Sequence, residues 1–194
     1  MAGQRAAAGL VLAALGLTAA GCGLGGTKTV TVHARTVTTT VTVTTTAAAT
    51  SAKPCTGEQL SGTFVLVPGS AGAGQIEYAL TLTNTSHGAC YVRGIPRATL
   101  LNAAAGALPT HVTAAGGETP TRVVLEPGAA SVAHARFSPD VPGQGDSQSG
   151  ACQPQAHTLQ VMPNGGGVTD AAIKPSTSVC ERGTLNFEAL GYAG

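Results

Sequence analysis

The sequence predicts an all-β domain, an antiparallel β-sandwich of the Ig-like or Greek-key type with two disulfides. Three observations support this fold class. After Pro54 the chain consists of short runs of alternating apolar and polar residues, separated by Gly, Pro and Asn turns. No window carries a helical apolar stripe of useful length. Four cysteines follow Pro54, an even number that suits a disulfide-stabilised, exported domain.

Residues 1–21 have the features of a bacterial lipoprotein signal peptide. Arg5 supplies the positive charge, an apolar segment rich in Leu, Ala and Gly follows, and Ala19-Ala20-Gly21-Cys22 forms a cleavage and lipidation box. Lipidation at Cys22 would add two acyl chains, enough for stable membrane anchoring on the extracytoplasmic face of the cell membrane. The alternatives are an uncleaved transmembrane anchor over 6–24 and plain secretion.

Residues 22–54 are expected to be the lipidated Cys22 followed by a disordered tether. Twelve threonines lie between Thr27 and Thr50, interleaved with Val and Ala. Low complexity and the lack of large apolar side chains argue against a packed core. The Thr-Val alternation has β propensity and leaves a short strand open. Threonine-rich exported segments are also plausible O-glycosylation acceptors, which is a hypothesis here.

Residues 55–194 form the predicted sandwich domain. In the clearest strand, Ile76, Tyr78, Leu80 and Leu82 alternate with more polar residues, so one face is expected to be buried and the other solvated. The candidate strands are Gly62–Val67, Gln75–Thr83, Ala89–Val92, Ala98–Asn102, Thr121–Leu125, Ala130–Phe137, Thr158–Met162 and Thr184–Leu190.

The cysteines of this domain are Cys55, Cys90, Cys152 and Cys180. Four cysteines allow three pairings. We favour the sequential one, Cys55–Cys90 and Cys152–Cys180, in which each bridge would stabilise the fold by roughly 3–4 kcal/mol. This support matters because aromatic residues are only 3% of the chain and Trp is absent. Only His87 and Cys90 have a sequence spacing typical of metal ligands, and no metal site is predicted.

Several short motifs resemble one known family. They are Leu82-Thr83-Asn84-Thr85-Ser86, Cys90, Gly94, Pro96, Leu100-Leu101, Gly106, Leu125-Glu126-Pro127-Gly128, Cys152, Cys180 and Gly183-Thr184-Leu185. The set is similar to domain of unknown function 4232, found in exported and lipid-anchored envelope proteins of actinobacteria. The resemblance covers nearly all of 55–190. It implies an envelope location and lends no catalytic residues.

Asn84-Thr85-Ser86 also has a direct physical interpretation. Short polar side chains at the end of a strand bond their own backbone, so a turn is expected here. The same three residues match an N-glycosylation acceptor, but a structural turn is the better interpretation.

A search for chemistry identifies no catalytic residue and no cofactor. The histidines His33, His87, His111, His134 and His157 form no HxH, HxxH or HExxH pattern. His134 and Arg136 share a predicted strand face, where a structural pair is expected. Ser147 lies in a Gly/Gln/Ser loop without a Gly-x-Ser-x-Gly motif. Asp140 and Asp146 are candidates for the carboxylate pair of a glycoside hydrolase, but sequence does not show the distance between them.

The expected function is therefore a lipid-anchored, non-catalytic binding or structural module of the cell envelope. The domain carries six basic and nine acidic residues, which excludes a basic footprint for nucleic acid. The expected partners are the membrane and another envelope protein or a wall component. Loops 138–156 and 163–181 are the predicted contact surface. One alternative is a hydrolase of wall or lipid esters, using Ser147 or a histidine, and another is a thiol or metal carrier.

Overall fold

The structure is a computed structural model that describes residues 28–34, 37–43, 52–116 and 121–193. The predicted signal peptide and Cys22 lie outside the described residues. The chain divides into two units, 1–47 and 48–194, which are described separately. Within the described ranges, no helix is both long and apolar enough to cross a membrane.

The first unit contains a pair of strands. β1 (Lys28–Ala34) and β2 (Val37–Val43) pair antiparallel, from Lys28 opposite Val43 to Ala34 opposite Val37. Over these residues the structure contains the short strands that the sequence left open. The physical reason is the β propensity of alternating Thr and Val, whose branched side chains favour extended backbone.

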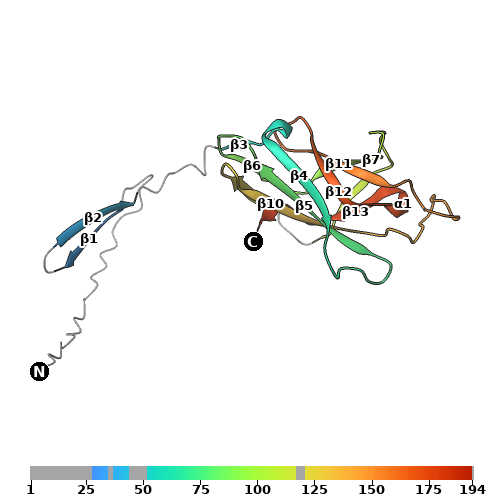
Figure 1. Ribbon diagram of the computed structural model, residues 1–194, viewed down its shortest axis with the longest axis horizontal. Coiled ribbons are helices and arrows are strands. Elements are labelled where there is room, and N and C mark those ends of the chain that lie inside the picture. The colour runs from blue at the N-terminus through green and yellow to red at the C-terminus, as the bar shows by residue number, and fades with distance from the viewer. Residues whose placement is uncertain (1–27, 35–36, 44–51, 117–120, 194) are drawn as a thin grey trace, which may run out of the picture. The chain divides into compact units, whose positions relative to one another are not determined.

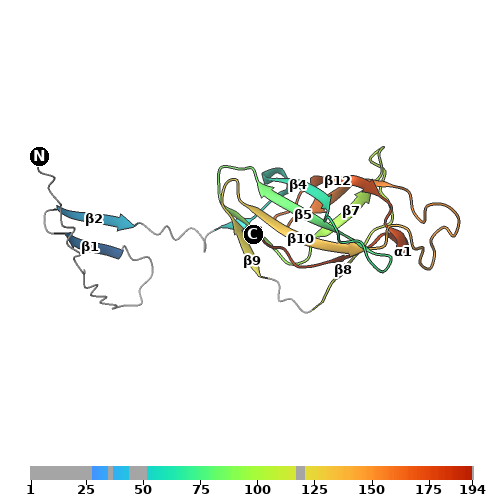
Figure 2. The same ribbon diagram turned by 60° about the horizontal axis from the view of Figure 1, so that its bottom comes forward.

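The second unit is built from two sheets that share one core (Figure 1; Figure 2). The larger sheet has the strand order β7-β11-β12-β4-β5-β10-β13-β8, with β14 also beside β10, and the smaller one is β3-β6-β9. The strands are β3 (Lys53–Pro54), β4 (Leu60–Leu66), β5 (Ile76–Asn84), β6 (Cys90–Arg93), β7 (Arg97–Leu101), β8 (His111–Ala114), β9 (Arg122–Leu125), β10 (Ala130–Phe137), β11 (Ala156–Met162), β12 (Thr169–Thr177), β13 (Thr184–Phe187) and β14 (Gly191–Tyr192). A 3-10 turn, η2 (Gly57–Gln59), precedes β4, and a short turn, α1 (Cys180–Gly183), precedes β13.

The prediction of an all-β, sandwich-like domain is confirmed, but strand pairing is mixed rather than purely antiparallel. β4 pairs parallel with β12, β8 with β13, and β3 with β6. All other strand pairs of the described residues are antiparallel. The alternation of side chains shows which face of a strand is buried and carries no information on the direction of its partner.

Strand β12 was not expected, and its presence corrects the predicted loop over 163–181. Thr169, Ala171 and Ile173 are buried and alternate with exposed residues, so the strand obeys the period of two. Small side chains and Pro175 concealed this pattern. Proline is tolerated because the ladder to β11 is irregular there: Thr158 pairs with Ala172, and the next pair joins Ala156 to Thr177.

The core is built around an aromatic cluster. It contains all three phenylalanines of the chain, Phe64, Phe137 and Phe187, together with Tyr78. The ring centroid of Phe64 lies 5.1 Å from that of Tyr78, 6.4 Å from that of Phe137 and 6.0 Å from that of Phe187. The Tyr78 hydroxyl donates to the Pro175 carbonyl (2.9 Å), and burial raises its pKa. The few rings of the chain are thus concentrated in one part of the core, where each contributes a large buried area.

Both predicted disulfides are confirmed. Cys55 bonds to Cys90 and Cys152 to Cys180, with sequence separations of 35 and 28 residues. In the chain-entropy view each bridge contributes about 3–4 kcal/mol by restricting the unfolded chain. The first bridge joins the chain after β3 to the start of β6, and the second joins the loop before β11 to α1.

The predicted turn at Asn84 is confirmed, and it links the two sheets. Asn84 ends β5 and is fully buried. Its Oδ1 accepts from the backbone N–H of Ser86 (3.0 Å) and from the Ser86 hydroxyl (2.7 Å). Its Nδ2 donates to the carbonyls of Gly88 (2.8 Å) and Leu125 (2.9 Å), and Leu125 is the last residue of β9. Because the amide nitrogen makes these two bonds in a buried position, Asn84 serves as a structural joint.

Replacing Asn84 tests this joint. Asn84→Ala removes the donor to the buried Leu125 carbonyl and one donor to the Gly88 carbonyl, so we expect the free energy of unfolding to fall by about 1–3 kcal/mol. Urea denaturation followed by far-UV circular dichroism measures the change. The matched control is Asn102→Ala, because the Asn102 side chain bonds only within one hairpin tip. An equal fall in the free energy of unfolding in the two variants would contradict the role of Asn84.

Candidate functional site

A row of polar residues crosses the outer face of four adjacent strands of the larger sheet. In the β5-β10-β13-β8 register, Glu77 lies opposite Arg136, Arg136 opposite Asn186, and Asn186 opposite Thr113. Their neighbours along the strands, such as Tyr78 and Phe187, point into the core. The period of two along each strand and the register between strands together produce this polar face.

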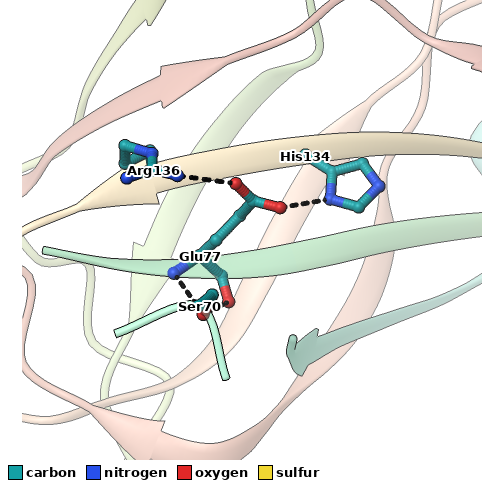
Figure 3. Close-up of polar contacts among 4 residues, drawn as sticks. All are labelled: Ser70, Glu77, His134 and Arg136. Atoms are coloured by element: carbon teal, nitrogen blue, oxygen red, sulfur yellow. Dashed lines mark hydrogen bonds and ion pairs between the residues drawn. The ribbon is translucent and has the colours of Figure 1, made fainter. Parts of the chain in front are cut away.

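Glu77 is the centre of a charged cluster on this row (Figure 3). Its Oε1 lies 2.7 Å from Nδ1 of His134, and since a carboxylate only accepts, His134 donates. Nη2 of Arg136 donates to Oε2 of Glu77 at 3.3 Å. The Ser70 hydroxyl accepts from the backbone N–H of Glu77 and donates to its carbonyl. The expected pairing of His134 and Arg136 is therefore organised by a carboxylate from the neighbouring strand.

This cluster borders a cavity of about 430 Å³, which we call the groove. The groove is lined by Glu77, Ala114, Ala115, His134, Arg136, Asn186 and Glu188. None of these residues carries a hydroxyl or thiol. Catalysis by a Ser, Thr or Cys nucleophile needs such a group beside a base. Ser70 does not supply one, because its hydroxyl is bound to the backbone of Glu77. The groove is thus suited to binding through charged and amide groups.

A second organised region surrounds Asp146, which is only 9% exposed. Its carboxylate accepts from the backbone N–H groups of Gly143 (2.8 Å), Glu181 and Arg182 (2.9 Å), and from the Gln153 amide (2.7 Å). The bond from Gln153, together with the three backbone bonds, lowers the pKa of Asp146 to about 2 against the opposing effect of burial. Asp146 therefore connects the loop after β10 to α1 as an anion.

The Cys152–Cys180 disulfide lies beside Asp146. The Asp146 carboxylate and the two sulfur atoms are within 4.8 Å of one another. Metal binding by cysteine requires thiolates, and both sulfurs are joined in the disulfide. The same reasoning applies to Cys90, the neighbour of His87, which is bonded to Cys55. These residues are structural in the oxidised protein.

The turn α1 contains two residues in the left-handed region. Glu181 has φ 53° and Arg182 has φ 57°, a conformation that costs about 1–2 kcal/mol for each non-glycine residue. Asp146 offsets this cost, since it accepts from both N–H groups. Gly183 follows because a Cβ there would lie 1.8 Å from the Pro109 carbonyl oxygen. The two hydrogen bonds to Asp146 and the close approach of Gly183 to Pro109 thus hold this turn in place.

A second cavity, of about 530 Å³, opens at this turn. It is lined by Pro109, Thr110, His111, Glu181, Arg182 and Thr184. The Thr184 hydroxyl donates to the Glu181 carbonyl (2.6 Å), and the Thr110 hydroxyl donates to the Leu108 carbonyl (2.9 Å). Sequence reasoning did not identify this site, because 70 residues separate His111 from Glu181 and no local pattern connects them.

The other residues considered from sequence are not brought together. The Ser147 hydroxyl donates to the Ser149 carbonyl (2.7 Å), and no histidine of the described residues bonds to it. The Asp140 side chain is exposed and makes no hydrogen bond within the described residues, whereas Asp146 is buried. Exposed His87 and His157 line neither cavity. Glu77, which organises the groove, was missed because its partners are on another strand.

Acid unfolding tests the role of Asp146. Its folded-state pKa of about 2 lies below the ordinary value of 3.8, so its ionised form stabilises the fold above about pH 4 and this contribution is lost as the pH falls towards 2. We expect Asp146→Asn to lower Tm at neutral pH and to reduce the fall in Tm between about pH 5 and about pH 2. Calorimetry across this range measures both effects. Asp140→Asn is the control. An Asp146→Asn variant whose Tm falls with pH as much as that of the wild type would contradict the role of Asp146.

The glycines and turn residues of the motifs quoted above have structural roles. Gly94 and Gly128 have φ of 79° and 82°, which side chains disfavour. Gly183 is confined by Pro109, and Asn84 joins the two sheets. A family model described as "Domain of unknown function (DUF4232)" matches residues 55–190. No curated protein and no solved structure matches the sequence significantly. The match spans more than half of the chain, which therefore belongs to the DUF4232 family.

Proposed function

We propose that this protein is a lipid-anchored envelope protein whose sandwich domain binds a partner through the groove without catalysis. One observation carries the proposal. The Glu77 carboxylate bonds both His134 and Arg136 at a cavity whose lining carries no hydroxyl or thiol. Fixed, mutually oriented charges favour recognition of a complementary surface. The partner would be another envelope protein or a wall component.

The location outside the cytoplasm is supported by the two disulfides, which form and persist in oxidising compartments. The proposal further specifies that a lipid anchor holds the protein at the membrane. It is supported by the Ala19-Ala20-Gly21-Cys22 box at the end of the apolar N-terminal segment. A hydrolase gains no support from the contacts of Ser147, whose hydroxyl is bound to the Ser149 carbonyl.

Replacing Cys22 tests the anchor. We expect Cys22→Ser to move the protein from the membrane fraction to the soluble fraction, because the acyl chains can no longer be attached. Mass spectrometry of the wild type should show a diacylglyceryl group on the peptide that begins at Cys22. A Cys22→Ser variant that stays in the membrane would instead support the transmembrane alternative.

A crosslinked pull-down tests recognition through the groove. The full-length, anchored protein is captured from its own membranes, and bound components are identified by mass spectrometry. We expect a specific partner with the wild type and its loss with Glu77→Gln, which weakens the contacts to His134 and Arg136. Glu58→Gln is the matched control, since Glu58 is exposed on η2 and does not line the groove. Equal recovery with all three proteins, or no specific recovery, would contradict the proposal, provided circular dichroism shows that each variant is folded.

A further inference from the structure

We propose that the second cavity, at the α1 turn, binds a short zwitterionic peptide. In this assignment Arg182 and His111 hold the ligand carboxylate, and Glu181 holds its ammonium group. The site is separate from the groove, and its test does not depend on the function proposed for the groove. The inference rests on the partners of three ionisable side chains, on the rigidity of the turn that presents two of them, and on their charges.

The three ionisable side chains at this cavity have no partner among the described residues. The Glu181 carboxylate, the Arg182 guanidinium and the His111 imidazole make no hydrogen bond or ion pair there, although all three line the same cavity. In the groove, by contrast, the charged side chains have partners, because the Glu77 carboxylate bonds both His134 and Arg136. Glu181 and Arg182 are adjacent in sequence yet do not form a salt bridge with each other, and no other side chain in the described part of the chain pairs with either charge.

The backbone that presents these charges is held in a costly conformation. Two successive left-handed residues are retained only where the surroundings enforce them, and such positions cluster at ligand sites. Here the surroundings are the Asp146 carboxylate, which accepts from both N–H groups, and the disulfide at Cys180. A site whose backbone is fixed before binding loses less conformational entropy on complex formation.

The side chains at the turn are also positioned by the neighbouring loop. A Cβ on Gly143 would lie 2.8 Å from Cγ of Glu181, and one on Gly145 would lie 3.2 Å from Cδ of Arg182. The stems of Glu181 and Arg182 therefore pack against these two glycines. Both residues line the cavity and are exposed.

The charges select the class of ligand. A guanidinium binds a carboxylate through two parallel hydrogen bonds, and a carboxylate accepts from an ammonium group. A purely anionic ligand would be repelled by Glu181, and a purely cationic one by Arg182. A molecule with both charges close together satisfies both residues. The volume of about 530 Å³ lies within the range of small-ligand pockets, and Pro109 offers an apolar wall for a small side chain.

Three probes that differ in one charge test the proposal. They are the dipeptide Ala-Ala, its N-acetyl form, which lacks the ammonium group, and its C-terminal amide, which lacks the carboxylate. The titration is followed by amide chemical shifts of the folded, oxidised protein. We expect Ala-Ala to shift residues 109–111 and 181–184, and each capped form to bind about tenfold more weakly, because it loses one charge-assisted contact.

Matched variants assign each charge. We expect Arg182→Gln to weaken the binding of Ala-Ala about tenfold while leaving the affinity for the amide unchanged. We expect Glu181→Gln to weaken the binding of Ala-Ala about tenfold while leaving the affinity for the acetyl form unchanged. Arg136→Gln, in the groove, should leave all three affinities unchanged. Equal affinities for the three probes, shifts that map elsewhere, or no shifts up to the solubility limit would overturn the proposal. The same spectra show whether each variant is folded.

Discussion

The buried amide of Asn84 is the contact on which the arrangement of the two sheets depends. It ends the central strand β5, and its Nδ2 reaches the carbonyl of Leu125 at the end of β9 in the smaller sheet. The second Nδ2 bond, to Gly88, fixes the chain just before Cys90 enters β6. Cys90 is in turn bonded to Cys55. A buried polar group with all of its partners in place specifies one relative position of the elements that it joins, because any displacement would leave a buried group unpaired.

With the sheets joined in this way, a small number of rings can fill the core. Phe64, Tyr78, Phe137 and Phe187 come from β4, β5, β10 and β13, which are neighbours in the larger sheet. Since these strands bury one face, their other face is free to carry polar residues. The groove cluster of Glu77, His134 and Arg136 lies on this outer face, so its geometry follows from the packing beneath it.

The two cavities lie toward opposite ends of the same parallel strand pair. β8 and β13 run together from His111 opposite Thr184 to Phe187 opposite Ala114. The cavity at the α1 turn is lined near the start of this pair and the groove near its end. Their electrostatic character differs. In the groove the charged side chains bond one another, whereas at the α1 turn Asp146 holds the backbone and leaves the side-chain charges available. A rigid scaffold that presents two different polar sites is a common basis for recognition.

Sequence alone determined the features that depend on local periodicity and on counting. The alternation in β5 and β10, the turn at Asn84 and the even number of cysteines all predicted what the structure contains, because burial of one strand face imposes a period of two. Only the tertiary structure decided the rest. The parallel pairs, the strand through Pro175, the contact of Glu77 with His134 and the left-handed turn bound to Asp146 all join residues distant in sequence. Such pairings follow from the register and packing of whole strands, which local periodicity does not encode.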